Sequence, residues 1–320
     1  MKTATRFVLA AVLGSAVTAL AQSYPNRTIR LVVPYTPGGG TDIVARVIAA
    51  KMSESIGQNV VVENRPGANG NIGMEAVAKS AADGYTIVYA LFAQYAVNPH
   101  LYQKLAFDPL KDLVPVALMV RSPYVLVTHP AVPVKNVKEL IALARARRGE
   151  LAYATPGYGS GSHLSGEMLK AMAKLDLTHV SYKGAGPALV DTVAGQVPMT
   201  FATWSSSGAY ARAGRVRALA VTTARRVSVL PDLPAISETL PGYDMSVWYG
   251  VSAAAGTPRE VIAKLNAELN RVLQAPDFRS RIEVDANEGI GGTPEQFGDY
   301  IRNEHARWGK LIRDMNIRIE

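Results

Sequence analysis

The chain has 320 residues, a formal net charge of +8 and no cysteine. The absence of cysteine excludes disulfides, a thiol nucleophile and a thiolate metal site, so a hydrophobic core must hold the fold together. The positive charge attracts anions in general, but the basic residues are scattered, and we expect no nucleic acid as a partner.

The N-terminal segment differs in kind from the rest of the chain. Lys2 and Arg6 precede an apolar run over 7–19, and the Ala-Leu-Ala sequence at 19–21 is typical of the site that a signal peptidase cleaves. The run is shorter than a membrane span needs. We therefore predict that 1–21 is a removed export signal and that the mature protein resides in the periplasm.

The next part of the chain alternates strand-like and helix-like segments. Apolar β-branched runs predict strands, and apolar residues that recur every three or four positions predict helices between them. In chain order the expected elements are a strand at 28–33, a helix at 42–56, a strand at 59–62, a helix at 72–81 and a strand at 85–90.

A second block repeats this alternation, and long helices follow it. Its expected elements are strands at 124–127, 151–154, 179–182, 199–203 and 216–222, with helices at 137–148, 162–173 and 185–194. The last expected elements are a strand at 248–253 and polar-faced helices at 259–273 and 294–315. Such alternation favours an α/β fold with a mainly parallel sheet covered on both faces.

The two blocks predict two lobes with a cleft between them. We expect the first lobe to comprise 22–123 and 248–320, because the C-terminal helices complete it, and the second to comprise 124–247. The lobes would close by a hinge near 121–124 and 244–248, where the chain crosses between them.

One local design occurs in both blocks: a strand, a glycine-rich loop, a capping residue and a helix. The first copy includes Tyr35 to Asp42, and the second includes Thr155 to His163. Glycines let a ligand approach backbone amides, and a helix start offers unpaired N–H groups with about half a positive charge. Ligands of α/β folds settle at the carboxyl ends of strands, where these loops lie. A single such loop is as often only a turn, but two facing copies predict a site for a carboxylate or phosphate group.

Other kinds of site have less support in the sequence. Neither loop matches the P-loop or the dinucleotide-binding pattern, and the histidines lack the spacing of a zinc site, so we expect no metal or cofactor. Ser160, Ser162 and His163 allow the hypothesis of a periplasmic hydrolase, but no G-x-S-x-G elbow is present, and we predict that the protein is not an enzyme.

The order of the motifs resembles the Bug family, the extracytoplasmic solute receptors of tripartite tricarboxylate transporters. The likeness rests on motifs at 35–42, 63–70, 83–86, 98–102, 161–164, 182–184, 219–222, 230–234 and 255–258. It implies a type II periplasmic-binding-protein fold, a small carboxylate held partly through ordered waters, and delivery of that ligand to a membrane permease. A monomer is the expected state of such a receptor. A binding protein that feeds a sensor is an alternative.

Carried over position by position, the two loops and the resemblance assign ligand binding to five regions of the chain. The predicted ligand-binding residues are Tyr35, Gly38, Gly39, Gly40, Thr41, Asp42, Phe92, Gln94, Thr155, Gly157, Gly161, Ser162, His163, Tyr182, Lys183, Gly184 and Thr203. Pro156 and Tyr158 stand where many relatives have small polar residues, and they could narrow the pocket. An aromatic acid is therefore an alternative to a di- or tricarboxylate.

Three of these residues have a structural interpretation beside the functional one. Asp42 could cap a helix or accept a hydrogen bond from a ligand, and His163 could make a structural hydrogen bond or contact the ligand. Lys183 could pair with a carboxylate or extend into solvent.

Overall fold

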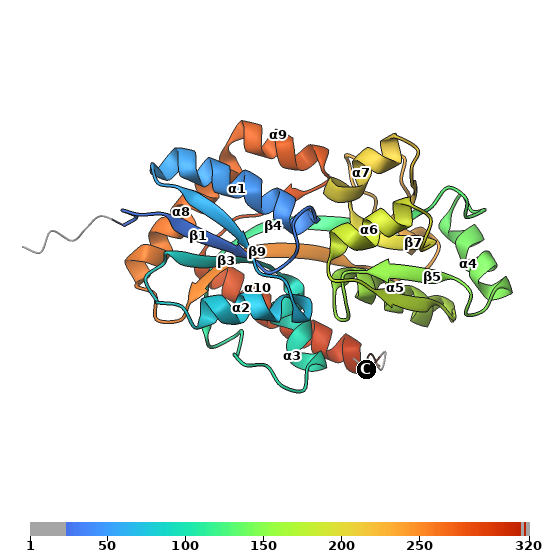
Figure 1. The fold of residues 1–320 in the computed structure, drawn as a ribbon, viewed down its shortest axis with the longest axis horizontal. Helices are drawn as coiled ribbons and strands as arrows, with labels where there is room; N and C mark the ends of the chain where they lie inside the picture. Colours follow the sequence, from blue (N-terminus) through green and yellow to red (C-terminus); the bar gives the residue numbers. More distant parts are fainter. Residues whose placement is uncertain (1–23, 315–316, 318–320) are drawn as a thin grey trace, which may run out of the picture.

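The computed structural model describes residues 24–314 and residue 317, so the predicted export signal lies outside the described residues. Two α/β lobes lie end to end, and strands β4 (Leu113–Thr128) and β9 (Ser246–Ala254) run along the molecule between them (Figure 1). No helix in the described part of the chain has both the length and the hydrophobicity of a membrane-spanning segment.

The first lobe contains a sheet with the strand order β2–β1–β3–β9–β4. Strand β1 (Ile29–Val33) lies parallel to β2 (Val60–Asn64) and to β3 (Thr86–Leu91). Strand β9 runs antiparallel to β3 and β4, and the short β10 (Glu288–Gly289) pairs with β4. The helices of this lobe are α1 (Gly40–Ile56), α2 (Asn71–Ala78), α3 (Asn98–Leu101), α8 (Arg259–Gln274), α9 (Pro276–Val284) and α10 (Pro294–Asp314).

The second lobe repeats this plan on a smaller sheet. Strand β5 (Ala152–Thr155) lies parallel to β6 (Thr178–Ser181) and β7 (Met199–Thr203). Strand β4 pairs antiparallel with β7 and with β8 (Arg217–Val221). The helices are α4 (Val137–Ala146), α5 (Gly161–Ala173), α6 (Ala185–Val193) and α7 (Trp204–Arg212). The predicted mainly parallel sheet is therefore correct for the strands that alternate with helices, whereas the strands that join the lobes are antiparallel.

Strand β4 is much longer than the predicted strand at 124–127. Its first part pairs with β9 as far as Pro123, and its last part, from Tyr124, pairs with β7 and β8. Pro115 and Arg121 interrupt the apolar pattern of the first part, which hid it in the sequence. The sheet accommodates Pro115 because the register between β4 and β9 shifts there. Arg121 pairs with Trp248, so the two segments expected to form the hinge lie side by side.

The sequence patterns missed two helices of ordinary length, α7 and α9. The first turns of α7 are rich in serine, a residue that favours turns because its hydroxyl competes for backbone hydrogen bonds. In the structure, Ser206 and Ser207 donate from their hydroxyls to the carbonyl oxygen of Thr203, which lies directly before the helix. These local bonds fit a helix start, so the same residues begin a helix rather than a loop.

Helix α10 packs on the first lobe through buried aromatic residues. The rings of Phe92 and Trp308 lie 5.3 Å apart, and the rings of Trp248 and Phe297 meet edge to face at 5.8 Å. The indole nitrogens of Trp248 and Trp308 both donate to the same oxygen of Glu304, at 3.1 and 3.2 Å. This cluster fixes the end of the chain against β9, one of the two strands that join the lobes.

Replacing Trp308 by alanine tests how much this cluster contributes. Trp308 is 1% exposed, and truncation of a buried tryptophan leaves a cavity that costs about 3–5 kcal/mol. We expect urea unfolding to show a loss of that size. Lys310→Ala, on an exposed position of the same helix, is the control and should change stability by less than about 0.5 kcal/mol. Equal, small effects of both changes would show that the cluster does not anchor α10.

Candidate functional site

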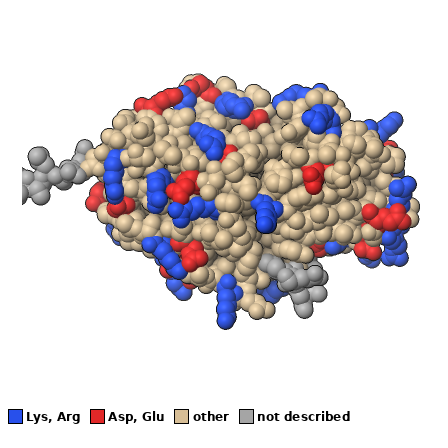
Figure 2. Space-filling view, in the orientation of Figure 1, with Lys and Arg blue, Asp and Glu red and all other residues tan. Residues whose placement is uncertain are grey.

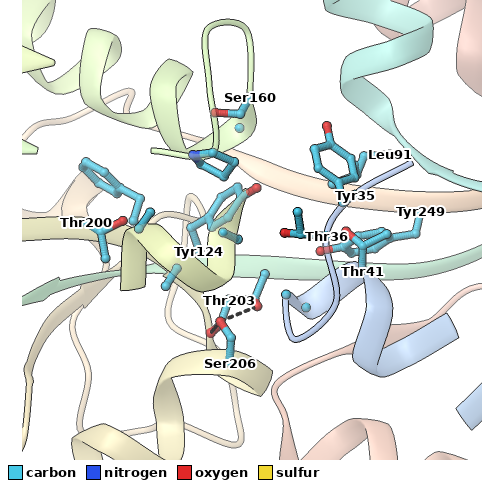
Figure 3. Close-up of a pocket in the computed structure, with 18 residues that line it drawn as sticks. Tyr35, Thr36, Thr41, Leu91, Tyr124, Ser160, Thr200, Thr203, Ser206 and Tyr249 are labelled. Carbon is cyan, nitrogen blue, oxygen red and sulfur yellow. Dashed lines mark hydrogen bonds between the residues drawn. The ribbon is translucent and has the colours of Figure 1, made fainter. Parts of the chain in front are cut away.

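A narrow cavity, here called the inner cavity, lies between the two lobes (Figure 3). The space in it that is open to the centre of a water-sized sphere is about 40 Å³, which suffices for about three water molecules. Four helices start at its wall, α1 from the first lobe and α5, α6 and α7 from the second. Its lining residues are Tyr35, Thr36, Gly39, Gly40, Thr41, Leu91, Tyr124, Pro156, Ser160, Gly161, Ala185, Ala188, Thr200, Phe201, Ala202, Thr203, Ser206 and Tyr249.

None of the described residues that line the inner cavity carries a charge. The first N–H groups of each helix have no partner within their own helix, and each helix start carries about half a positive charge. Four such starts around one small, mostly buried space favour an anion without any cationic side chain. The cavity therefore suits a group of the size and charge of a carboxylate.

The lobes meet so closely at the inner cavity that side chains are excluded from two positions. A methyl group on Gly40, the first residue of α1, would lie 2.3 Å from Thr203 Oγ1 across the cavity. One on Gly184, before α6, would lie 2.0 Å from Thr36 Oγ1, and Gly184 also has a φ of +150°. Only glycine allows the backbone of each lobe to approach a threonine side chain of the other lobe this closely.

Hydroxyl groups reach into the cavity from both lobes. Thr36 Oγ1 is buried and has no hydrogen-bond partner among the described residues, which leaves it free to bind a ligand oxygen or a bridging water. Figure 3 shows Thr36 and Tyr124 approaching the middle of the cavity from opposite sides. Burial raises the pKa of Tyr124 and Tyr249 above the ordinary range of a phenol, so both remain neutral hydrogen-bond donors.

Asp42 lies in the first turn of α1, but its carboxylate is occupied by its own lobe. It accepts hydrogen bonds from the backbone of Gly38, from the amide of Asn64 and from two guanidinium nitrogens of Arg46, at 2.9–3.1 Å. Burial alone would raise the pKa of Asp42, but these bonds outweigh burial and lower it. The contacts fit the structural interpretation of Asp42, because they fix the first loop to α1.

His163 also supports its loop from within the second lobe. Its Nδ1 accepts a hydrogen bond from the backbone N–H of Gly159 at 3.2 Å, and its ring lies 4.5 Å from the ring of His179. The Ser160 hydroxyl accepts from the backbone N–H of His163 and caps α5. Among the described residues, neither Ser160 nor Ser162 forms a hydrogen bond with the imidazole of His163, which the hydrolase hypothesis needs.

A second, larger cavity, here called the outer cavity, adjoins the inner one and shares Tyr35, Thr36 and Pro156 with it. By the same measure its volume is about 510 Å³. Several residues of its wall are exposed, so it opens to solvent. Its other lining residues are Pro66, Gly67, Ala68, Asn69, Gly70, Tyr102, Gly157, Tyr158, Ser181, Tyr182, Lys183 and Gly184.

The residues predicted to bind a ligand fall into two groups in the structure. Those that line one of the two cavities are Tyr35, Gly39, Gly40, Thr41, Gly157, Gly161, Tyr182, Lys183, Gly184 and Thr203. Those that line neither are Gly38, Asp42, Phe92, Gln94, Thr155, Ser162 and His163. Gln94 lies behind the wall, where it donates to Tyr35 Oη and to the carbonyl oxygen of Asn69.

Sequence reasoning missed Tyr124, and it favoured a core or lobe contact over a ligand contact for Tyr249; the two residues come from the strands that join the lobes. These residues face the cavity because β4 leaves one sheet for the other at Tyr124, whose N–H donates to the Thr222 hydroxyl at 2.9 Å. The predicted start of a strand at Tyr124 was the one available signal. Thr36 was missed because the sequence does not indicate which side of the first loop faces the second lobe.

The chain matches the family model described as the tripartite tricarboxylate transporter family receptor over residues 44–317. The chain belongs to this receptor family. Protein BugT of Bordetella pertussis is 36% identical to it over 318 residues, which cover 98% of this chain and 97% of BugT. The resemblance to the Bug family is thereby confirmed.

Solved structures of receptors of this kind share the fold. R. palustris Rpa4515 with adipate has a TM-score of 0.90 and 39% identity, and the match covers 92% of this chain and 99% of that chain. MatC (Rpa3494) from Rhodopseudomonas palustris with bound malate has a TM-score of 0.86 and 34% identity, covering 90% of this chain and 100% of that chain. The predicted type II periplasmic-binding-protein fold is confirmed.

The buried histidines beneath the second loop predict a loss of stability in acid. Burial, and then the neighbouring imidazole of His179, lower the pKa of His163 to about 3, and burial lowers that of His179 to about 4. Below pH 6.5 the unfolded chain binds protons that the folded chain excludes, so stability falls as the pH drops toward those values. The buried His163 contributes up to about 1.4 kcal/mol per pH unit, and the more exposed His179 contributes less.

We expect His163→Gln to reduce the difference in unfolding free energy between pH 7.5 and pH 5, measured by urea unfolding at both values. The variant can be less stable at both pH values, so the comparison is the difference between them. If the difference in unfolding free energy between the two pH values is as large in the variant as in the natural protein, burial does not lower the pKa of His163.

Proposed function

We propose that this protein is an extracytoplasmic solute receptor that binds a small carboxylate in the inner cavity and delivers it to the permease of a tripartite tricarboxylate transporter. The observation that carries the proposal is the convergence of four helix starts on a small cavity whose described lining residues carry no charge. Adipate and malate, the molecules named with two solved relatives, are both carboxylates. The periplasm is the compartment that fits this role.

The binding mechanism follows from the chemistry of the cavity wall. A ligand carboxylate accepts hydrogen bonds from the amides at the starts of α1 and α5, with Gly40 and Gly161 allowing its close approach. Thr36 and Tyr124 add neutral hydroxyl donors. A fixed set of dipoles replaces the water around the carboxylate. Among the described residues of the wall, therefore, no buried cation is left without a partner when the ligand leaves.

We further propose that ligand binding closes two lobes, 22–123 with 248–320 and 124–247. In support, β4 changes its pairing partners between Pro123 and Tyr124, and the Thr222 hydroxyl donates to Met245 O at 2.6 Å beside this point. A ligand that contacts both lobes binds better to the closed form and shifts the population toward it. The permease would recognise the closed form.

Thermal unfolding with malate, adipate and benzoate, with methylammonium as a non-anionic control, tests the proposal. A carboxylate at 100 times its dissociation constant stabilises the folded state by about 2.7 kcal/mol, which raises the melting temperature by several degrees. Small-angle scattering should show a smaller radius of gyration with the same compound. If carboxylates change neither quantity, this chain is not a receptor for them.

The contact between the lobes predicts a difference between two neighbouring glycines. Gly40→Ala would place a methyl group 2.3 Å from Thr203 Oγ1, so the lobes could not close fully around a ligand. We expect a loss of carboxylate affinity of about tenfold or more by titration calorimetry, since such overpacking costs about 1–3 kcal/mol.

Gly39→Ala is the matched control. Gly39 has an extended backbone with φ −80°, and its added methyl group would lie 3.4 Å from Ala185 Cβ, an ordinary contact. This variant should bind within about threefold of the natural protein, because such a contact adds little strain. Similar losses in both variants would mean that closure across Gly40 is not required for binding.

A further inference from the structure

The inner cavity is too small for most small organic acids in full. Its 40 Å³ holds a carboxylate group and a few neighbouring atoms, whereas the outer cavity beside it offers about 510 Å³. Thr36 lines both cavities, so a ligand that starts in the inner cavity and is too long for it must continue past Thr36 into the outer one. The wall of the outer cavity therefore selects the far end of the ligand.

The outer cavity differs from the inner one in its electrostatics. Lys183 is its single charged residue among the described residues of the wall, and no acidic side chain lines it. The ammonium group of Lys183 has no carboxylate partner within ion-pair distance in the described part of the chain. A cation at the wall of an otherwise uncharged cavity favours a second negative group on the ligand.

Lys183 lies next to the boundary between the two cavities, where it can contact a ligand group that extends from the inner cavity into the outer one. Its neighbour Gly184 contacts Thr36, since a methyl group on Gly184 would lie 2.0 Å from Thr36 Oγ1. Consecutive Cα atoms are about 3.8 Å apart, so the backbone of Lys183 is one residue from the boundary between the cavities. The exposed side chain can therefore reach a ligand atom a few bonds beyond that boundary.

The aromatic residues Tyr158 and Tyr182 also line the outer cavity. The ring of Tyr158 packs against the rings of both His163 and His179, with centroids 5.3 and 4.6 Å away. The hydroxyl of Tyr182 donates to Asp191 at 2.7 Å. Because these contacts fix both rings, they offer a preformed apolar surface to the methylene groups of a chain.

We propose that Lys183 determines specificity for the far end of the ligand: while one carboxylate occupies the inner cavity, the ammonium group of Lys183 pairs with a second negative group in the outer cavity. This inference rests on the proposed function, because it assumes that the inner cavity holds a carboxylate. It adds that Lys183 determines whether a second carboxylate is favoured.

A matched pair of ligands and a matched pair of variants test this. Adipate and hexanoate have the same six-carbon chain but two and one carboxylates, and malate is a short comparison. Titration calorimetry would use the natural protein, Lys183→Met and Lys138→Met, an exposed lysine on α4 that lines neither cavity.

We expect Lys183→Met to lower adipate affinity by about two- to fivefold, the strength of an exposed ion pair, and to leave hexanoate affinity unchanged. Lys138→Met should leave both unchanged, and Lys183→Arg should retain the preference for adipate. Added salt should reduce the preference in the natural protein and have a smaller effect in Lys183→Met.

The outcomes separate this inference from the proposed function. If Lys183→Met changes both affinities equally or neither, or if malate binds while adipate does not, the inference is wrong and the receptor function stands. If the natural protein binds none of the three carboxylates, the receptor function itself falls, and the inference falls with it.

Discussion

The site depends on the close approach of a glycine backbone in each lobe to a threonine side chain of the other lobe. Gly40 faces Thr203 and Gly184 faces Thr36 at distances that leave no space for a β-carbon. This approach brings the starts of helices from separate parts of the sequence to one small volume. A single helix start is a weak attraction for an anion, but several that share one enclosed space, from which most water is excluded, act together. The capacity to bind is therefore a property of the contact between the lobes.

Charge is distributed in a way that fits this arrangement. The net positive charge of the chain is carried by lysines and arginines scattered over both lobes, without a continuous basic area on the face in Figure 2. The charged side chains in the first turns of α1, Asp42 and Arg46, form an ion pair and hold the first loop, and neither lines the inner cavity. Fixed dipoles inside and a lysine at the wall of the outer cavity provide two different environments along one path. This difference in electrostatic environment between the two cavities suits a ligand that must enter, bind and leave without chemical change.

Much of the architecture could be predicted from the sequence because local rules determine it. The glycine-rich loops and the apolar periodicity of α1 and α5 indicated both helix starts, and both line the inner cavity, but only α5 has a side-chain cap. The antiparallel course of β4 and β9 could not be predicted, since it depends on pairing between segments more than 100 residues apart. For the same reason Tyr124 was missed, and Tyr249 was interpreted as a core residue. Residues such as Gln94 were placed in the right region, but only the fold shows that they support the wall from behind.

The central claim is that backbone amides at helix starts in both lobes hold the carboxylate. Amide chemical shifts in ¹⁵N–¹H correlation spectra, recorded while a bound carboxylate is titrated, test this most directly. The account predicts that the largest downfield proton shifts belong to Gly40, Thr41, Gly161 and Ala185, at the starts of α1, α5 and α6. Large shifts confined to other regions, with these four amides unchanged, would contradict it.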